Sequence, residues 1–144
     1  MKIGELAQAA HCTPETIRYY EKSGLMFSPQ RTQANYRVYT AAHLERLRFI
    51  RNCRSLDMTH EEIRSLLEYI DHPPSDCAPV NALIEEHMRH VDTRLQELQL
   101  LRHQLSELRQ SCHRPGGLEQ CGIVQSLRLM DTESSTTHPY THIT

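Results

Sequence analysis

The sequence has 144 residues, enough for about one ordinary domain, so a large multi-domain enzyme is excluded. Hydrophobic residues make up 38% of the chain, Trp is absent and Phe occurs twice, so the aromatic side chains that usually fill a large core are scarce and a core shared in a dimer is expected. The net charge of −2 hides a local excess of +6 between Thr16 and Arg54, which indicates either a surface that faces a polyanion or a solvated helix face with scattered arginines.

The first two predicted elements are short helices joined by a tight turn. The spacing i, i+3, i+4, i+7 of a one-sided apolar helix is met by Ile3, Leu6, Ala7 and Ala10. Thr13 is a good N-cap and Pro14 suits the first helical position, so a second helix is expected to run to about Lys22 and to stop near Gly24. This helix-turn-helix has a donor-rich outer surface, as expected of a DNA recognition helix, formed by Glu15, Thr16, Arg18, Tyr19 and Lys22.

A small β-hairpin and a second helix-turn-helix are predicted next. Residues 26–39 contain two short extended pieces, which fit a hairpin wing. A helix is expected over residues 41–55, with its inward apolar positions at Leu44, Leu47 and Ile50 and its outward basic positions at Arg46, Arg48 and Arg51. Thr59 and Glu62 form a capping box ahead of another apolar face, which is made of Ile63, Leu66, Leu67 and Ile70.

The rest of the chain predicts a long dimerisation helix. After a breaker-rich hinge, residues 79–110 contain no Gly and no internal Pro, and apolar residues recur at a mean step of about 3.4, which matches a coiled-coil seam. That seam consists of Ile84, Met88, Val91, Leu95, Leu98, Leu101, Leu105 and Leu108. Because a single helix would expose this seam, we expect a homodimer.

The predicted fold is therefore mainly α-helical, with five segments. They are a winged helix-turn-helix DNA-binding domain (residues 1–71), a hinge (72–78), a dimerisation helix that pairs as a long antiparallel coiled coil (79–111), a metal-binding loop with a short helix (112–130) and a disordered tail (131–144).

Three of the five cysteines suggest a metal site. No stretch approaches the roughly 18 apolar residues of a membrane span and the start lacks the apolar stretch of a signal peptide, so we expect a cytoplasmic protein with reduced thiols and no membrane partner. Cys112 and Cys121 flank a Pro-Gly-Gly loop, whereas Cys77 is separated from Cys112 by a helix of about 48 Å. If two such helices run antiparallel, Cys77 of one subunit reaches Cys112 and Cys121 of the other. Three thiolates suit cadmium, lead, mercury or zinc and exclude magnesium and calcium.

The other cysteines and the histidines have less specific interpretations. Cys12 and Cys53 are expected to be small core residues. His87 and His90, three residues apart, are candidates for an accessory metal site, with solvated histidines as the alternative. The same two interpretations apply to the tail residues His138 and His142.

Four segments together resemble the MerR family of transcriptional regulators. They are Ile3-Gly4-Glu5-Leu6-Ala7, Thr16-Ile17-Arg18-Tyr19-Tyr20-Glu21, Asn35-Tyr36-Arg37-Val38-Tyr39 and Arg48-Phe49-Ile50-Arg51. The stretch from Val80 to His87 and the Cys121-Gly122-Ile123 end resemble the branch that senses cadmium and lead. Copper sensors of the family have Ser at the position of Cys77, and zinc sensors have tandem cysteines where this chain has Cys112-His113. Mercury sensors share the three-cysteine layout, and His113 could substitute for the second of the tandem cysteines, so mercury and zinc remain alternative effectors.

The resemblance implies a mechanism and a set of DNA contacts. Dimers of such proteins sit on a promoter with an overlong spacer and, on binding metal, untwist the double-stranded DNA so that RNA polymerase can open it. In this chain the resemblance places Thr16, Arg18, Tyr19 and Lys22 in or beside the major groove, and Tyr36 and Arg37 of the wing on the DNA backbone.

Two other classes of function fit the sequence less well. An enzyme is not expected, because the sequence shows no paired carboxylates, no Ser/His/Asp arrangement and no phosphate-binding Gly loop. The other alternative is a thiol redox switch, which would form a disulfide between Cys112 and Cys121 on the same DNA-binding scaffold.

Overall fold

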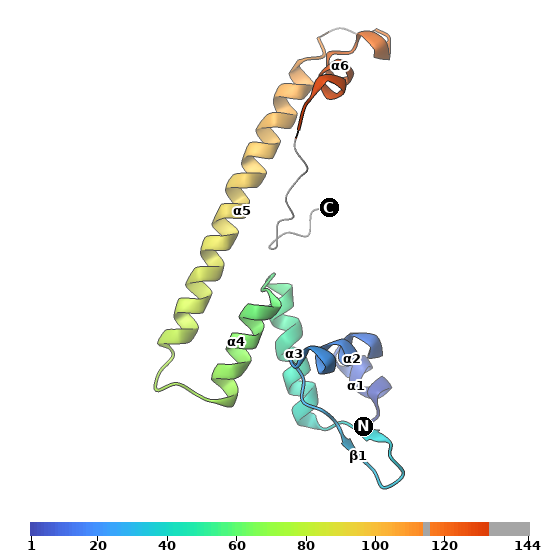
Figure 1. The fold of residues 1–144 in the computed structure, drawn as a ribbon, viewed down its shortest axis with the longest axis vertical. Helices are drawn as coiled ribbons and strands as arrows, with labels where there is room; N and C mark the ends of the chain where they lie inside the picture. The colour runs from blue at the N-terminus through green and yellow to red at the C-terminus, as the bar shows by residue number, and fades with distance from the viewer. Residues whose placement is uncertain (114–115, 133–144) are drawn as a thin grey trace. The chain divides into compact units, whose positions relative to one another are not determined.

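A computed structural model describes residues 1–113 and 116–132 of the chain. These residues form six α-helices, one 3-10 helix and a two-stranded sheet (Figure 1). They divide into two compact units, residues 1–83 and the residues from Ile84 onward. The prediction of a mainly helical fold with an N-terminal helix-turn-helix and a long helix after it is confirmed. The predicted tail lies, from residue 133 on, outside the described residues.

The helix-turn-helix consists of α1 (Ile3–Ala9) and α2 (Pro14–Ser23), which pack against each other. Between them the chain turns sharply at His11, which has a positive φ of 56°. The Thr13 side chain accepts a hydrogen bond from the backbone N–H of Thr16, as expected for an N-cap. Gly24 ends α2 in the left-handed conformation, where φ is 81°. Local capping chemistry therefore fixes both ends of α2.

The predicted wing is a hairpin of β1 (Gln30–Arg31) and β2 (Arg37–Val38). The strands are antiparallel, with Gln30 opposite Val38 and Arg31 opposite Arg37. Its loop closes through two hydrogen bonds, from the backbone N–H of Asn35 to the carbonyl of Thr32 and from the N–H of Thr32 to the carbonyl of Tyr36. The Asn35 backbone has a φ of 67°, a conformation that Asn tolerates better than most residues.

The second helix-turn-helix consists of α3 (Ala41–Ser55) and α4 (His60–Asp71). The capping box of Thr59 and Glu62 is present, since each side chain accepts the backbone N–H of the other residue. The four helices and the wing of the first unit share one core. Its buried residues are Leu6, Ala7, Ala10, Ile17, Tyr20, Leu25, Met26, Tyr39, Leu47, Ile50, Cys53, Met58, Ile63, Leu66 and Leu67. Ile70, which was predicted to face inward, is instead 54% exposed.

Two of the arginines predicted to point outward from α3 lie instead against the interior. The Nε atom of Arg46 donates to the carbonyl of Leu25 at 2.7 Å, and its Nη1 lies 3.0 Å from the Asp71 carboxylate. Arg51 donates to the carbonyl of Ala10 at the end of α1. A long guanidinium satisfies such carbonyls while its aliphatic stem stays packed. Of the three predicted outward positions, only Arg48 is exposed.

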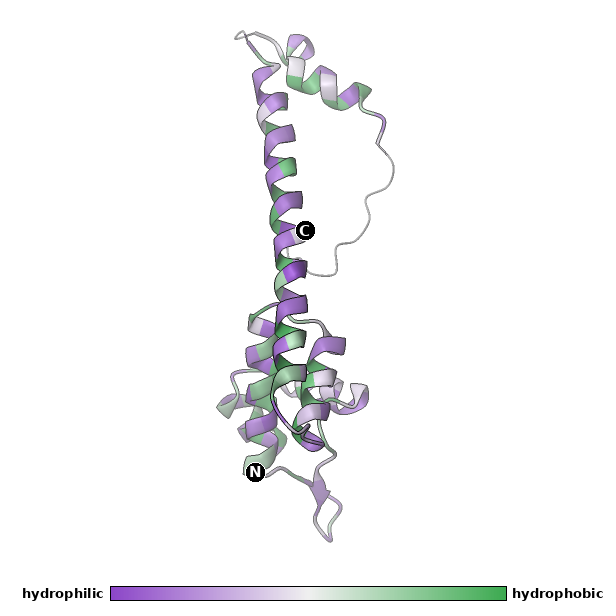
Figure 2. Ribbon diagram, turned by 90° about the vertical axis from the view of Figure 1, so that its left-hand side faces the viewer, coloured by the Kyte–Doolittle hydropathy of each residue, from purple (hydrophilic) through white to green (hydrophobic). Residues whose placement is uncertain are grey.

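The second unit contains most of α5 (Ala78–Gln110), the 3-10 helix η1 (Leu118–Gln120) and α6 (Gly122–Leu129). Figure 2 shows apolar residues spaced among hydrophilic ones along α5. Several residues of the predicted seam are 41–58% exposed, namely Met88, Val91, Leu95, Leu101 and Leu105. In the part of the chain that the structure describes, no helix is both long and apolar enough to span a bilayer.

Candidate DNA-binding surface and thiol site

The outer face of α2 carries the side chains predicted to contact DNA. Arg18, Tyr19 and Lys22 are exposed, and Arg18 lies 3.7 Å from the carboxylate of Glu15. Thr16 is half-buried and its hydroxyl lies 2.9 Å from that of Thr13, so it takes part in the N-cap. An exposed pair of arginine and carboxylate contributes little stability, so Arg18 is available for another partner.

Glu21 ties the wing to α2. Its carboxylate accepts a hydrogen bond from the Tyr39 hydroxyl at 2.6 Å and another from Arg37 at 3.4 Å. Burial and the bond to Glu21 raise the pKa of Tyr39, so this hydroxyl keeps its proton. Tyr36 is 72% exposed beside them. These two bonds therefore tie Arg37 and Tyr39 to α2.

Sequence reasoning assigned no role to Glu21 or to His60. Glu21 is one of two acids in the basic segment, a signal that could have singled it out. The His60 Nδ1 atom lies 3.2 Å from the hydroxyl of Tyr19, and this contact across 41 residues has no local sequence signal.

Cys112 and Cys121 meet in the second unit. Cys112 follows α5, and Cys121 is the N-cap residue of α6. The Cys121 sulfur accepts hydrogen bonds from the backbone N–H groups of Val124 and Ile123 and from the Cys112 thiol, and these bonds lower its pKa. A thiol with a lowered pKa is more often deprotonated at neutral pH, and the thiolate is the form that binds metals.

Gly122 lets α6 approach the end of α5 this closely. A side chain at this position would overlap the carbonyl group of Ser111, which directly precedes Cys112. The glycine therefore permits the backbone approach that brings the two thiols together. The sequence showed no signal for this contact.

Of the three predicted thiols, the structure brings together Cys112 and Cys121; Cys77 belongs to the first unit. Cys77 is exposed directly before α5, and its sulfur lies 3.8 Å from the Asn81 amide nitrogen. Around it is a shallow, mostly apolar hollow that is also lined by Phe49, Leu66, Tyr69 and Ile70.

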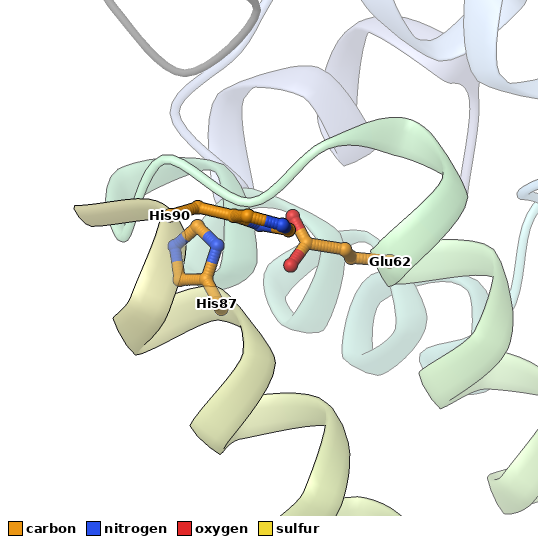
Figure 3. A group of neighbouring side chains, drawn as sticks. All are labelled: Glu62, His87 and His90. Carbon is orange, nitrogen blue, oxygen red and sulfur yellow. The ribbon is translucent and has the colours of Figure 1, made fainter. Parts of the chain in front are cut away.

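The remaining cysteines were expected to be core residues, and His87 and His90 to be an accessory metal pair or solvated side chains. Burial raises the pKa of the thiols of Cys12 and Cys53, of which Cys53 is buried and Cys12 half-buried. His87 and His90 both project from α5 with ring centroids 6.4 Å apart, and Figure 3 labels them with Glu62 of α4. The His90 Nε2 atom lies 3.2 Å from the carboxylate of Glu86. The tail residues His138 and His142 lie outside the described residues.

Comparison with known proteins identifies related regulators. Residues 1–70 match the family model "MerR HTH family regulatory protein", and residues 44–108 match "MerR, DNA binding". The HTH-type transcriptional regulator ZntR homolog of Haemophilus influenzae is 48% identical over 110 residues, which cover 76% of this chain and 82% of that protein.

Two solved structures share the fold. The transcription regulator PbrR691 from Ralstonia metallidurans CH34, in complex with lead(II), is 46% identical with a TM-score of 0.80. The match covers 88% of this chain and 98% of that one. The dual function transcriptional regulator MerR from Bacillus megaterium MB1, in complex with a mercury(II) ion, is 27% identical with a TM-score of 0.72, and the match covers 89% of this chain and 99% of that one.

Proposed function

The chain belongs to the MerR family of helix-turn-helix regulatory proteins, which bind DNA and are not enzymes, and we propose that it is a metal-responsive transcriptional regulator. In this proposal a homodimer binds promoter DNA and, when it binds cadmium or lead, distorts the DNA so that RNA polymerase can transcribe heavy-metal resistance genes. Mercury and zinc are the alternative effectors. The observation that supports the proposal is the close approach of Gly122 to Ser111, which brings the neighbouring Cys121 and Cys112 together, and the hydrogen bond from Cys112 that lowers the pKa of Cys121.

The donor set fits a soft divalent ion. Cys112 and Cys121 offer two sulfur atoms, one of which already accepts hydrogen bonds that favour its thiolate form. A third thiolate from Cys77 of the partner subunit would complete a three-sulfur set. A bound ion would then crosslink the two subunits. His87 and His90 are an accessory pair in this proposal, with no role in the three-sulfur set.

An antiparallel dimer would bring the third thiolate into reach. Cys77 directly precedes α5 and Cys112 lies two residues beyond its end. With 33 residues, α5 is about 50 Å long, too long for one chain to join its own Cys77 and Cys112. When two copies pair antiparallel along the exposed seam, the start of one helix lies beside the end of the other. The apolar exposure of that seam supports the pairing.

The DNA contacts in this proposal come from α2 and the wing. Arg18, Tyr19 and Lys22, with the Thr16 hydroxyl beside them, face the major groove or its phosphates, while Tyr36 and Arg37 contact the backbone. We expect Arg18→Ala to weaken binding to promoter DNA and to lower the salt dependence by roughly one unit of slope for each arginine lost. Arg89→Ala, on exposed α5, changes the net charge equally and is the control. Equal affinity of the two variants would remove α2 from the DNA interface.

Subunit mixing tests the shared metal site. A Cys77→Ser chain mixed with a Cys112→Ser, Cys121→Ser chain gives a heterodimer in which one site keeps all three thiols and the other keeps none. We expect tight cadmium binding and a thiolate-to-metal absorption band only after mixing, with one ion per heterodimer. Full affinity in the Cys77→Ser homodimer, or no recovery in proven heterodimers, would refute the shared site.

The contact between Cys112 and Cys121 also favours a second candidate, a thiol redox switch. The two candidates differ in an anaerobic, reducing transcription assay. Activation by cadmium or lead under those conditions supports the metal sensor, because no disulfide can form there. Activation only by an oxidant supports the redox switch.

A further inference from the structure

The first turn of α4 reaches the outer face of the recognition helix. His60 is the first residue of α4, and its Nδ1 atom lies 3.2 Å from the Tyr19 hydroxyl on α2. The two rings are also in contact, tilted by 49° with their centroids 5.5 Å apart. Tyr19 is 52% exposed, so its side chain would have several open rotamers without this partner.

The core in turn holds His60. Tyr20 is almost fully buried, and its ring meets the imidazole edge-on at a centroid distance of 6.2 Å. The contacts therefore run from a fixed core residue through a half-buried imidazole to an exposed phenol. Such a chain of contacts restrains the phenol although most of its surface faces solvent.

We infer that His60 is a positioning residue for Tyr19, so that the affinity for promoter DNA depends on a hydrogen bond made outside the recognition helix. The inference rests on the proposed DNA-binding role of α2. It extends that role to a residue of the second helix-turn-helix.

The hydrogen-bond chemistry suits a phosphate partner. A phenol has one proton to donate, and a phosphate oxygen only accepts. When the His60 Nδ1 carries the imidazole proton and donates it to the Tyr19 oxygen, the Tyr19 proton is free for the phosphate. Burial and the charges of Arg54 and Arg64 lower the pKa of His60, so the ring is neutral at pH 7 and can adopt this tautomer. The groups that face the ring are thus Tyr19 and Tyr20 of α2, Arg54 of α3 and Arg64 of α4.

The size of the effect follows from side-chain ordering. Immobilising one flexible side chain at an interface corresponds to roughly a threefold to tenfold change in affinity, and the bond to His60 restrains Tyr19 before DNA arrives. Loss of the bond should therefore weaken binding by about that factor in each recognition helix.

The variants separate positioning from packing. His60→Leu keeps an apolar side chain against Tyr20 but has no hydrogen-bonding atom. His60→Asn places an amide near the position of Nδ1 and can still donate to the phenol. Tyr19→Phe removes the hydroxyl from the other side and leaves α4 untouched. The double variant completes a mutant cycle.

The test measures binding of the full-length dimer to a duplex that the wild-type protein selects from a random-sequence library, at fixed salt. We expect Tyr19→Phe and His60→Leu to weaken binding, His60→Asn to stay within about twofold of wild type, and the double variant to bind like Tyr19→Phe. Equal thermal unfolding midpoints establish that each variant is folded.

Three results would overturn the inference. They are unchanged affinity of His60→Leu, additive losses in the double variant, and a loss in His60→Asn equal to that in His60→Leu. If His60→Leu fails to fold, unchanged affinity of the folded Tyr19→Phe variant overturns it equally. Should the wild-type protein select no DNA at all, the proposed function fails together with the inference, whereas the other results leave the proposed function standing.

Discussion

Replacement of Gly122 by alanine tests whether metal binding depends on the close approach of α6 to the end of α5. A Cβ atom at this position would overlap the carbonyl oxygen of Ser111 and lie 2.8 Å from its carbonyl carbon. Because ordinary van der Waals contact begins at 3.4 Å and the oxygen lies closer still than the carbon, the two backbones must separate by more than about 1 Å to accommodate the methyl group. Cys121 precedes Gly122 and Cys112 follows Ser111, so this separation moves the two sulfur atoms apart.

The displacement is large on the scale of a metal site. Metal–sulfur bonds of about 2.3 Å for zinc tolerate deviations of roughly 0.2 Å, so a shift of this size exceeds the tolerance several-fold. We expect the cadmium affinity of Gly122→Ala to fall roughly 10- to 100-fold, the usual result when a group that orients a metal ligand is lost.

Competition with a chromophoric chelator for cadmium measures this affinity in the purified dimer. Gly117→Ala is the matched control, because a Cβ at Gly117 meets no atom within 4 Å. Promoter binding by both variants without metal should equal that of the wild type, since α2 lies in the other unit. Equal cadmium affinities of Gly122→Ala and Gly117→Ala would refute the argument that this backbone approach builds the site.

Three further predictions concern stability and thiol reactivity. Arg46→Met keeps the apolar stem but loses the bond to the turn after α2 and the ion pair with Asp71, so the free energy of unfolding in urea should fall by about 2 kcal/mol; no change would show that the guanidinium is dispensable. Gly24→Ala forces a Cβ into the left-handed conformation, and thermal unfolding should show a loss of about 1 kcal/mol, whereas an unchanged midpoint would contradict the role of this C-cap. At pH 7 mass spectrometry should find Cys121 alkylated before Cys53, since the pKa of the first thiol is lowered and that of the second is raised by burial; the reverse order would contradict both assignments.

Local signals allowed the helix-turn-helix to be predicted closely. Thr13, Pro14 and Gly24 each act on the nearest turn of backbone, and α2 begins and ends beside them. The capping box of Thr59 and Glu62 fixed the start of α4 in the same way. Such signals are visible in a sequence because the atoms that interact belong to residues within one helical turn.

Side chains with long reach were predicted poorly. Periodicity placed Arg46 and Arg51 outside, but it describes the direction of the Cβ atom and not the end of a flexible guanidinium. Arg51 bonds the carbonyl of Ala10, 41 residues away in sequence, which no local pattern reveals. The basic excess of the N-terminal segment is thus partly structural, and fewer charges are free for DNA than the count suggested.

The candidate metal site was predictable only in part. A thiol at each end of a glycine-containing loop was sufficient to expect that Cys112 and Cys121 meet, and a side-chain hydrogen bond from Cys112 lowers the pKa of Cys121. The role of Gly122 could not be predicted from the sequence, because it depends on the close approach of two backbone segments that belong to different elements. The contribution of Cys77 from the partner subunit stays a prediction, since it concerns a second copy of the chain.

The bonds of Glu21 to Tyr39 and Arg37 have a thermodynamic consequence. They join the wing to α2 in the protein without DNA, so we expect association with DNA to require no folding of this region. Calorimetry should then give a heat-capacity change that matches rigid-body burial of surface, without the larger negative value that accompanies coupled folding. A protein in which the spacing between α2 and the wing is already set should also associate with DNA quickly, because binding then needs no conformational change that would lower the association rate.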